Sequence, residues 1–290
     1  MILFDGKKVA QKILGDIKKH IKKENIRPGL AVILIGDDES SRLYVRLKKE
    51  AAKKIGIAFS EINFSREAKQ EEIIAKIKEL NEDEKIHGVI VQLPLPAVFN
   101  GDEIIASIKP EKDVDGFHLE NRRLLEKGKE PFFLPVFPMA IMQAIESALN
   151  NFSAKKALAL VNSQVFGETL KLVLERNGIQ ADYMVRNTCV VFGAEKEVHE
   201  ADILIMALGC PSFIKGDVIK EGAILIDGGV TRFHDGKVVG DVDAKRVQSK
   251  AAFLTPVPGG LGPLTVALLL KNVYLSASKI SSMELLQKIK

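Results

Sequence analysis

A tyrosine and a lysine four residues apart could form a proton-transfer pair in this chain. They lie in the pattern Ser41-x-x-Tyr44-x-x-x-Lys48, inside a helix predicted to run to about Lys54. Residues at this spacing share one face of a helix, where a phenol can lower the pKa of a neighbouring ammonium and hold it in place. Such a lysine can donate or accept a proton near neutral pH. The same pair also occurs on solvated helix faces, so the spacing alone leaves both interpretations open.

Two polar stretches follow in the first half of the chain. Gln92 stands at the end of the strand predicted in HGVIVQLPLP (87–96), and parallel sheets bind ligands at the carboxyl ends of their strands. Its amide could bind a substrate or orient Lys48, or it could serve the loop backbone. In KDVDGF (112–117), Asp115 offers a carboxylate that could accept the N–H edge of a heterocycle, although Asp-Gly also suits an ordinary turn.

The most specific local pattern is TPVPGGLGPLT (255–265), in which three glycines and three prolines precede a predicted helix. Glycine lets backbone approach a flat ligand closely, and Pro263 suits the first turn of a helix. Simple turns rarely need so many of these residues, so we interpret the loop as part of a binding site.

Two successive alternations of strand and helix carry these residues. In the first, the apolar patterns predict strands at 30–36, 58–64 and 87–96 and helices at 7–24, 40–54 and 70–80. A segment rich in charge, Gly and Pro (110–138) separates it from the second. There, strands are predicted at 156–161, 180–185, 202–208, 223–228 and 251–255, and helices at 165–177 and 264–276.

This alternation predicts an α/β fold made of two α/β domains with a cleft between them. The second domain is predicted to be Rossmann-like, with a mostly parallel sheet. We assign residues 1–125 to the first domain, completed by a C-terminal helix at 264–290, and residues 126–263 to the second.

The composition favours a cytoplasmic protein. The 290 residues carry a net charge of +4, and Lys and Arg are spread beside Glu along helices, which argues against a nucleic-acid partner. The two cysteines, Cys189 and Cys210, argue for a reducing compartment and against a disulfide scaffold, and the five histidines show no metal-binding spacing. Charge interrupts the N-terminus, and the longest apolar runs, such as DILIMAL, have strand length, so neither a signal peptide nor a membrane partner is predicted.

From about residue 3 to 272, the chain resembles the bifunctional methylenetetrahydrofolate dehydrogenase/methenyltetrahydrofolate cyclohydrolase family, the FolD type. The resemblance rests on ordered motifs: SxxYxxxK, VQLPLP, KDVDGF, ADILIMALGCPSFIKGD (201–217), AILIDGGV (223–230), GDVD (240–243) and TPVPGGLGPLT. It implies oxidation of 5,10-methylenetetrahydrofolate by hydride transfer to a nicotinamide, followed by hydrolysis of the 5,10-methenyl product to 10-formyltetrahydrofolate. It also implies a homodimer and a part in purine biosynthesis.

The resemblance assigns roles to individual residues. It implies that Lys48 is the active-site lysine, that Tyr44 and Gln92 assist it, and that Asp115 binds the pterin ring. The implied substrate-binding residues are Ser41, Pro258, Gly259, Gly260 and Leu261. The implied cofactor-binding positions are Val161, Asn162, Ser163, Arg186 and Val230.

The cofactor positions depart from the family pattern. Where the family has Gly-Arg-Ser, this chain has Val161-Asn162-Ser163, so an uncharged amide replaces the arginine expected at the 2′-phosphate of NADP. A β-branched residue at the glycine position disfavours positive φ and pushes backbone away from a pyrophosphate. Phe137 replaces the threonine expected near the nicotinamide. Arg186 could restore phosphate affinity, and Ser163 can cap the helix and meet a phosphate.

The expected function is therefore both activities, with a small-molecule folate as substrate and NADP as cofactor. NAD, or no dinucleotide, stays open as an alternative, and no metal is expected. A cyclohydrolase that has lost the dehydrogenase is the second hypothesis, motivated by Val161, Asn162 and Phe137. A non-catalytic folate-binding protein is the third, and the presence of Lys48 and Tyr44 argues against it.

Overall fold

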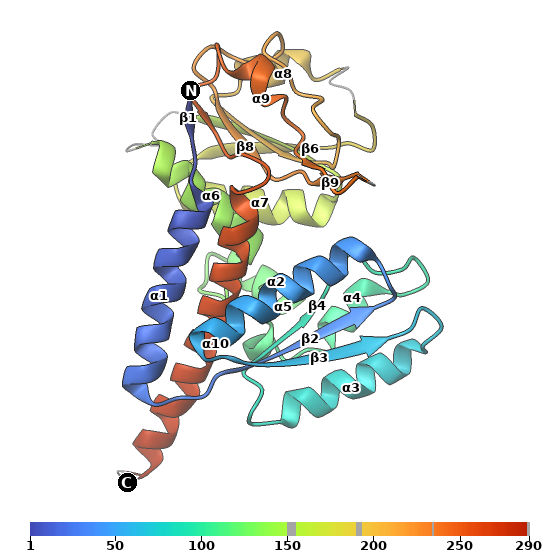
Figure 1. The fold of residues 1–290 in the computed structure, drawn as a ribbon, viewed down its shortest axis with the longest axis vertical. Helices are drawn as coiled ribbons and strands as arrows, with labels where there is room; N and C mark the ends of the chain where they lie inside the picture. Colours follow the sequence, from blue (N-terminus) through green and yellow to red (C-terminus); the bar gives the residue numbers. More distant parts are fainter. Residues whose placement is uncertain (150–154, 190–192, 234, 289–290) are drawn as a thin grey trace. The chain divides into compact units, whose positions relative to one another are not determined.

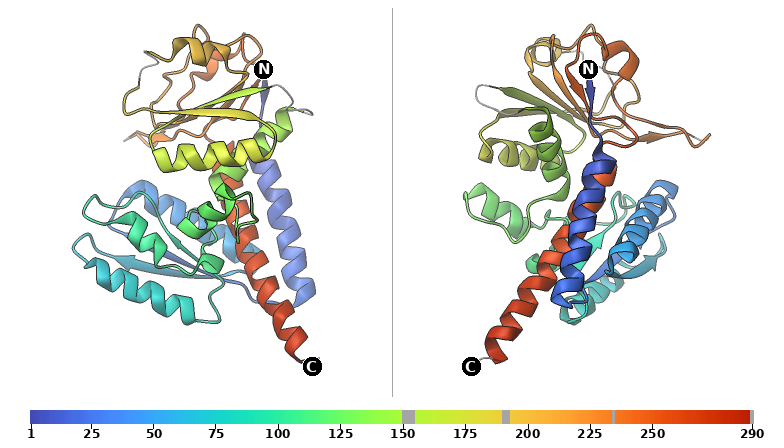
Figure 2. Two further views of the ribbon diagram at one scale, coloured as in Figure 1. Left: turned by 180° about the vertical axis from the view of Figure 1, so that it is seen from behind. Right: turned by 60° about the vertical axis from the view of Figure 1, so that its left-hand side comes forward.

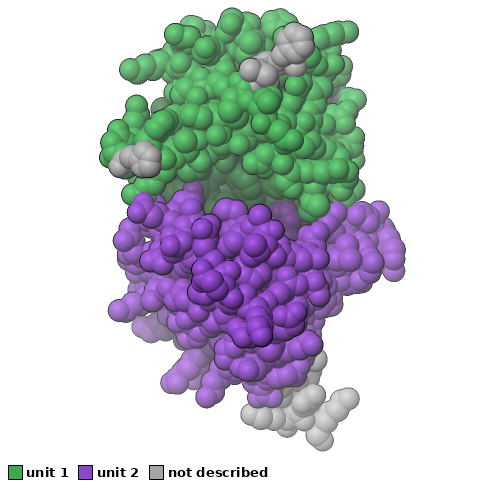
Figure 3. Space-filling view, turned by 90° about the vertical axis from the view of Figure 1, so that its right-hand side faces the viewer, with its two compact units in different colours: residues 1–9, 137–265 green, residues 10–136, 266–290 purple. Residues whose placement is uncertain are grey.

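The structure is a computed structural model that describes residues 1–149, 155–189, 193–233 and 235–288 (Figure 1). The chain divides into two compact units, which Figure 3 shows in different colours. The three-stranded unit contains Ala10–Val136 and Val266–Lys290. The six-stranded unit contains Met1–Val9 and Phe137–Thr265.

The start of the chain corrects one predicted assignment. Residues 1–125 were predicted to form one domain, but Met1–Val9 belong to the six-stranded unit. The reason is that β1 (Ile2–Leu3) pairs in parallel with β11 (Phe253–Leu254). A strand of this length gives no periodic signal in a sequence. The other predicted domain limits stay a prediction.

The three-stranded unit is built around a parallel sheet in the order β3-β2-β4. Its strands are β2 (Gly29–Ile35), β3 (Ala58–Phe64) and β4 (Gly88–Val91). Every residue of β2 is buried, in agreement with its continuous apolar run. Ile73 and Ile77 of α3 (Gln70–Glu82) join Ile33 and Val89 in the core of this unit.

Helices position the loops of this unit. α2 (Glu39–Ile55) ends at Gly56, whose φ of +90° suits glycine. Its N-cap is Asp38, whose carboxylate accepts the backbone N–H of Ser41 at 2.7 Å. The remaining short elements are α4 (Gly101–Ala106), the 3-10 helix η1 (Pro110–Lys112) and α5 (Leu119–Glu126).

Two long helices continue from one unit into the other: α1 (Gly6–Glu24) and α10 (Leu261–Lys288). Within the three-stranded unit they lie side by side (Figures 1 and 2), and the hydroxyl of Tyr274 donates to Glu24 at 2.6 Å. α10 was predicted to begin at Leu264, but it begins at Leu261 and takes Pro263 into its first turn.

One stretch of α10, Leu261–Ser278, is long and apolar enough to cross a membrane, with a mean hydropathy of 1.2. A search for uninterrupted apolar runs misses this stretch, because it contains Thr265, Lys271 and Asn272. Half of its residues, 50%, are buried inside the protein, and the core helix of a soluble protein passes the same test. The stretch is therefore weak evidence for a membrane.

The six-stranded unit contains a parallel sheet in the order β1-β11-β8-β7-β5-β6. The strands not yet given are β5 (Lys156–Val161), β6 (Gln180–Val185), β7 (Ile203–Ala207) and β8 (Ile224–Asp227). An antiparallel pair, β9 (Thr231–Arg232) and β10 (Val238–Val239), stands apart from this sheet. β5 comes first in the chain among these four strands and lies between β6 and β7, so the strand order reverses at β5.

Helices cover both faces of the six-stranded sheet. α6 (Val136–Ala148) and α7 (Gln164–Arg176) lie on one face, and α8 (Glu195–Glu200) and α9 (Ala244–Val247) lie on the other (Figure 1). The core on the second face joins Val198 of α8 and Val247 of α9 to Leu158 and Leu204 of the sheet. The predicted Rossmann-like arrangement with a mostly parallel sheet is confirmed.

Candidate active site

α2 and the end of β4 bring Lys48 and Gln92 together in the three-stranded unit. Nζ of Lys48 donates to Oε1 of Gln92 at 2.8 Å, and Nε2 of Gln92 donates to the carbonyl of Leu93 at 2.6 Å. The backbone N–H of Gln92 donates to the carbonyl of Ile33 at 2.8 Å, so β2 fixes the point at which this residue leaves the sheet. The side-chain amide is thereby held with its oxygen toward the lysine.

Burial controls the charges at this point. It lowers the pKa of Lys48, and the charge of Asp115 partly offsets the effect. Burial likewise raises the pKa of Asp115, and the charge of Lys48 opposes it. The pattern Tyr44-x-x-x-Lys48 suggested that the phenol lowers the pKa of the lysine, but burial is the main cause, and burial also raises the pKa of Tyr44 itself.

Ser41 adds a hydroxyl to the same face of α2. Its side chain is 2% exposed, and its Oγ has no hydrogen-bond partner among the residues that the structure describes. Ser41, Tyr44 and Lys48 are three and four residues apart, a spacing that keeps them on one helix face. A buried hydroxyl without a partner is costly, so this one is a candidate to bind a polar atom of a ligand.

The two aspartates of KDVDGF have different surroundings. Asp113 is 2% exposed and accepts the backbone N–H of His118 at 2.7 Å and the side chain of Asn121 at 3.3 Å. Burial, assisted by the charge of Asp115, raises the pKa of Asp113 to about 7. Asp113 therefore organises the loop, and Asp115 is the carboxylate that interacts with Lys48. Sequence patterns did not single out Asp113, because its partners are mostly backbone groups that no motif records.

Gly116 shapes the same loop. Its φ is +81°, and a Cβ there would lie 2.8 Å from the backbone of Leu134 and Pro135. Glycine alone meets both conditions, since other residues rarely adopt this φ and would collide with the neighbouring backbone. The Asp-Gly turn and Asp115 are thus parts of one loop, and ligand binding by Asp115 stays a prediction.

The turn after β5 is the expected pyrophosphate site of the six-stranded unit. Ser163 is the N-cap of α7, and its Oγ accepts the backbone N–H of Phe166 at 3.3 Å. Val161 is 0% exposed and is not among the residues with positive φ, so this turn forms without the backbone conformation that a glycine would allow. This agrees with the expectation that a β-branched residue here avoids positive φ, and its effect on a pyrophosphate stays a prediction.

Gly167 brings α7 close to the sheet. A Cβ on Gly167 would lie 2.8 Å from Cγ of the Tyr183 ring on β6 and closer still to Cδ2. Only glycine allows this approach of helix and strand, which is one role of the glycines in dinucleotide-binding turns. The N-terminus of α7, with Ser163, is therefore placed at the carboxyl end of β5, where it can receive a phosphate.

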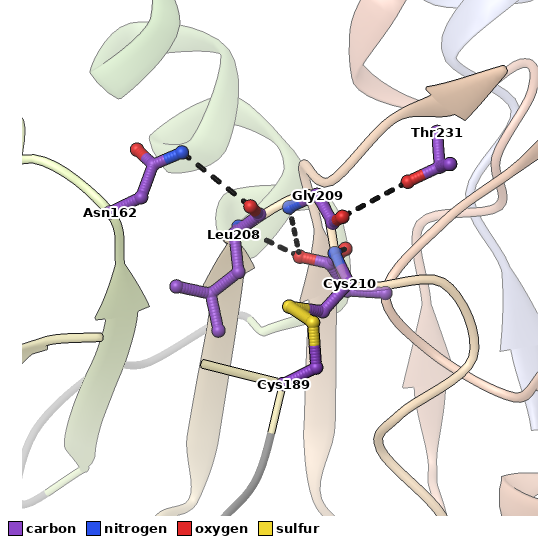
Figure 4. Close-up of a disulfide and its surroundings, with 7 residues drawn as sticks. Asn162, Cys189, Leu208, Gly209, Cys210 and Thr231 are labelled. Carbon is purple, nitrogen blue, oxygen red and sulfur yellow. Dashed lines mark hydrogen bonds between the residues drawn. A yellow bond between two sulfur atoms is a disulfide. The ribbon is translucent and has the colours of Figure 1, made fainter. Parts of the chain in front are cut away.

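Two predicted cofactor positions have polar contacts. Nδ2 of Asn162, an exposed residue, donates to the carbonyl of Leu208 at 3.5 Å, a long bond from the loop after β5 to the loop after β7 (Figure 4). Arg186 follows β6, and its backbone N–H donates to the carbonyl of Val161 at 2.8 Å. Its guanidinium also contacts the sulfur of Met184 at 3.8 Å. Val230, the last predicted cofactor position, is 43% exposed in the segment after β8.

Phe137 packs as a hydrophobic residue in the six-stranded unit. Its ring stacks on Phe166, with centroids 5.1 Å apart and an interplanar angle of 18°. A Cβ on Gly228, just beyond β8, would lie 2.6 Å from Cζ of Phe137, so the ring fills the space beside that glycine. These contacts give Phe137 a packing role that the threonine of the family pattern would not fill.

A buried pair of carboxylates, missed by sequence reasoning, holds the loops after β7 and β8. Asp241 accepts the backbone N–H groups of Leu208 at 2.8 Å, Gly209 at 3.3 Å and Cys210 at 2.6 Å. Asp227 accepts the N–H groups of Gly229, Asp241 and Val242 at 3.1, 3.0 and 2.9 Å. Burial raises the pKa of both, that of Asp227 to about 7. These aspartates belong to the motifs IDGG (226–229) and GDVD (240–243), which sequence analysis used only for the family resemblance. The backbone of GDVD donates hydrogen bonds to the aspartate of IDGG.

The two cysteines form a disulfide between Cys189 and Cys210, with Cα atoms 5.3 Å apart (Figure 4). The expectation of a chain without disulfide bonding was wrong for this pair, because two loops far apart in sequence converge at the carboxyl end of the sheet. A separation of 21 residues carries no signal for such a contact. Among the described residues, no group of His, Cys, Asp or Glu could hold a metal ion.

The glycine- and proline-rich loop belongs to the six-stranded unit. The side chain of Thr255 is fully buried, and its Oγ1 accepts the N–H of Asp227 at 2.7 Å. The N–H of Gly260 donates to the carbonyl of Pro256 at 2.7 Å, which closes the turn before α10. Pro258 is exposed, whereas Leu261 is 3% exposed. Of the predicted substrate-binding residues in this loop, Leu261 therefore contributes to the core.

The sheet order, the capped helix at the reversal point and the close helix–strand approach define a Rossmann-type dinucleotide-binding domain. The same chain carries a second α/β unit with a half-buried lysine and a carboxylate, which is the arrangement of a two-domain enzyme. The features at the end of β5 fit a dinucleotide: Ser163 and the free N–H groups of α7 suit a pyrophosphate, and Arg186 follows the second strand.

The chain belongs to the tetrahydrofolate dehydrogenase/cyclohydrolase family. The catalytic domain of that family matches residues 4–115, and its NAD(P)-binding domain matches residues 135–281. The expected family, its one-carbon folate chemistry and the nicotinamide cofactor are thereby confirmed.

Curated relatives and solved structures agree with this placement. The bifunctional protein FolD of Nautilia profundicola is 37% identical over 286 residues, covering 97% of this chain and 99% of that protein. FolD 2 of Geobacter sulfurreducens is 40% identical over 282 residues, covering 96% and 97%. The crystal structure of the Campylobacter jejuni FolD enzyme has a TM-score of 0.89 at 37% identity and covers 96% of this chain and 99% of that one. The Trypanosoma brucei enzyme, solved with NADP and an inhibitor, has a TM-score of 0.90 at 31% identity and covers 97% and 98%.

Proposed function

We propose that this protein oxidises 5,10-methylenetetrahydrofolate to 5,10-methenyltetrahydrofolate with NADP and hydrolyses the product to 10-formyltetrahydrofolate. The observation that carries the proposal is the hydrogen bond of 2.8 Å between the half-buried Lys48 and Gln92, with Asp115 interacting electrostatically with the lysine. A folate offers an N–H edge on its pterin ring and an electrophilic carbon, and this group of side chains suits both.

Lys48 moves the proton in this proposal. Because burial lowers its pKa, the amine is more easily deprotonated than an exposed lysine and can help to activate the attacking water. Gln92 accepts a hydrogen bond from the amine and holds it in place. Once deprotonated, the amine adds no positive charge beside the iminium-like carbon of the methenyl substrate. Tyr44 lies on the same helix face and assists in positioning.

Asp115 and Ser41 bind the substrate in this proposal. The Asp115 carboxylate accepts the N–H edge of the pterin, and the unpartnered hydroxyl of Ser41 contacts a polar atom of the ligand. The backbone of the loop Pro258–Leu261 contributes to the folate site, because glycines permit close approach to a flat ring.

NADP is the proposed cofactor, bound at the carboxyl end of β5. Ser163 and the first N–H groups of α7 would hold its pyrophosphate, and Arg186 its 2′-phosphate. Val161, Asn162 and Val230 would lie along the same edge. When bound, NADP supplies the acceptor for the hydride that leaves the methylene carbon. The proposal includes a homodimer that contributes to purine biosynthesis, as the family resemblance implies. It also includes a cytoplasmic location without a nucleic-acid or membrane partner, as the composition favours.

A paired assay on purified protein tests both activities. Decay of the methenyl absorbance is followed without cofactor, and its formation from the methylene substrate is followed with NADP and then with NAD. Activity in both arms supports the proposal, and the better cofactor identifies the preference. Activity in the hydrolysis arm alone would overturn the dehydrogenase half and leave a cyclohydrolase.

The residue that carries the proposal has a matched control on the same helix. Lys48→Ala should lower the rate of hydrolysis by about 100-fold or more, the usual range for loss of a general acid–base group. Lys49→Ala should leave the rate unchanged, because Lys49 is exposed and pairs with Glu61 at 2.9 Å. Normal hydrolysis by the Lys48 variant would contradict the assignment.

A further inference from the structure

The disulfide joins the loops that follow the two neighbours of β5. β6 and β7 both pair in parallel with β5, and Val161 at the end of β5 is level with Val185 and Ala207. Two strands separated by a third lie about 10 Å apart. The Cα atoms of Cys189 and Cys210 are only 5.3 Å apart, so the two loops converge beyond the ends of their strands. The bond thus links the two sides of the β5 turn (Figure 4).

This place matters for a dinucleotide. In a Rossmann sheet the ligand lies at the carboxyl edge where the strand order reverses, and the ribose contacts come from the loop after the second strand. Here the reversal is at β5, and the loop after β6 begins at Arg186 and includes Cys189. The loop after β6 is expected to bind the adenosine half of the dinucleotide. The disulfide therefore attaches this loop to the loop after β7.

The loop after β7 cannot easily yield to make room. Its residues Leu208, Gly209 and Cys210 donate three backbone hydrogen bonds to the buried Asp241. The carbonyl of Leu208 also accepts Nδ2 of Asn162, and that of Gly209 accepts the hydroxyl of Thr231 at 3.1 Å (Figure 4). Any opening would therefore fall to the Cys189 loop, whose residues from Asn187 to Cys189 are exposed.

We propose that Cys189 and Cys210 form a reversible oxidation site that controls access of NADP to the carboxyl edge of β5. With the disulfide formed, the two loops are drawn together and the dinucleotide binds weakly. With the thiols reduced, the Arg186–Cys189 loop is released and the site opens. The proposal rests on the dinucleotide use proposed above and adds a control to it.

Thiol–disulfide exchange with a low-molecular-weight or protein disulfide supplies the chemistry. The thiolate of Cys189, the exposed member of the pair, attacks the partner disulfide and releases one thiol. Cys210, 6% exposed, then displaces the second thiol and forms the internal bond. Two cysteine thiols are oxidised with loss of two protons and two electrons, and one external disulfide is reduced to two thiols. A dithiol reverses both steps.

NADPH binding to the full-length protein provides the test, with nicotinamide fluorescence as readout. Samples are oxidised with glutathione disulfide or reduced with a phosphine, and their thiols are titrated. Oxidation should remove both titratable thiols and weaken NADPH binding by about tenfold or more, a difference of ~1.4 kcal/mol. Cys189→Ser should bind like the reduced protein under both conditions. Hydrolysis of the methenyl substrate should be the same in all samples, because Lys48, Gln92 and Asp115 lie in the three-stranded unit and neither cysteine belongs to the Pro258–Leu261 loop.

The outcomes separate the two proposals. Equal or tighter NADPH binding after oxidation, or two thiols that still titrate, would overturn the control while leaving the dehydrogenase intact. Failure of the reduced protein to bind NADPH, with hydrolysis still active, would overturn both the control and the dehydrogenase half of the proposed function.

Discussion

Gly167→Ala should disturb the six-stranded unit and its dinucleotide site while sparing hydrolysis. The added Cβ would lie 2.8 Å from Cγ of Tyr183 and nearer to Cδ2, where ordinary contacts begin at 3.4 Å. Either α7 moves away from β6 by roughly 1 Å, or the ring leaves its rotamer. Overpacking of this kind typically costs about 1–3 kcal/mol in the free energy of unfolding. The shift also displaces Ser163 and the N-terminus of α7, so NADPH should bind more weakly, by up to about 100-fold for a displacement of this size.

The assays are urea unfolding and NADPH titration, with two controls. Gly15→Ala, at an open position inside α1, should be neutral or stabilising by about 1 kcal/mol, because a Cβ there meets nothing within 4 Å. Tyr183→Ala should remove the obstacle, so the double variant should be more stable than the two single effects predict. Strict additivity of the two substitutions, or unchanged NADPH binding in Gly167→Ala, would refute the steric argument.

Two further predictions concern charge. Asn162→Arg should strengthen NADPH binding by about tenfold or more and leave NADH unchanged, since a charge-assisted contact to the 2′-phosphate typically contributes ~1.5–3 kcal/mol; an equal gain for both nucleotides would show that the arginine does not reach that phosphate. The unfolding free energy should decline between about pH 4 and pH 7, because the folded-state pKa of Asp227 is about 7, well above its ordinary value of 3.8. When the folded-state pKa of a carboxyl is raised, its contribution to the free energy of unfolding is fully present below the unfolded-state pKa. That contribution is lost as the pH rises through the folded-state pKa. Asp227→Asn should reduce the difference between the unfolding free energies measured by urea titration at pH 5 and pH 8. An equal difference in the wild type and the variant would contradict this prediction.

Several strands were predictable because burial on both faces leaves a continuous apolar run. The run 30–36 became β2, in which all residues are buried, and the runs after residue 155 became the six-stranded sheet. The end of HGVIVQLPLP was not strand, since β4 stops at Val91 before the prolines. β1 could not be predicted, because its two residues gain their structure only by pairing with β11.

The candidate site was predictable where a side chain meets another element at a strand end, as Gln92 meets Lys48. It was not predictable where backbone groups are the partners. Asp113, Asp227 and Asp241 each bind backbone N–H groups from other parts of the chain, and a sequence records neither those directions nor the burial that shifts the pKa values. The disulfide was not predicted for a related reason, because the convergence of its two loops depends on the order of the strands in the sheet.

The pairing of β1 with β11 bears on how the chain is completed during synthesis. β1 emerges first, but its partner Phe253–Leu254 follows only near the end, so the edge of the six-stranded sheet stays open until most of the protein has been made. The three-stranded unit also depends on a segment that is translated late, because Asn272 of α10 donates to the carbonyl of Val114 at 2.9 Å. Neither unit is a contiguous segment, so a ribosome-bound fragment ending near residue 136 would lack parts of both. Helix α10, which is translated after β11, therefore completes both units.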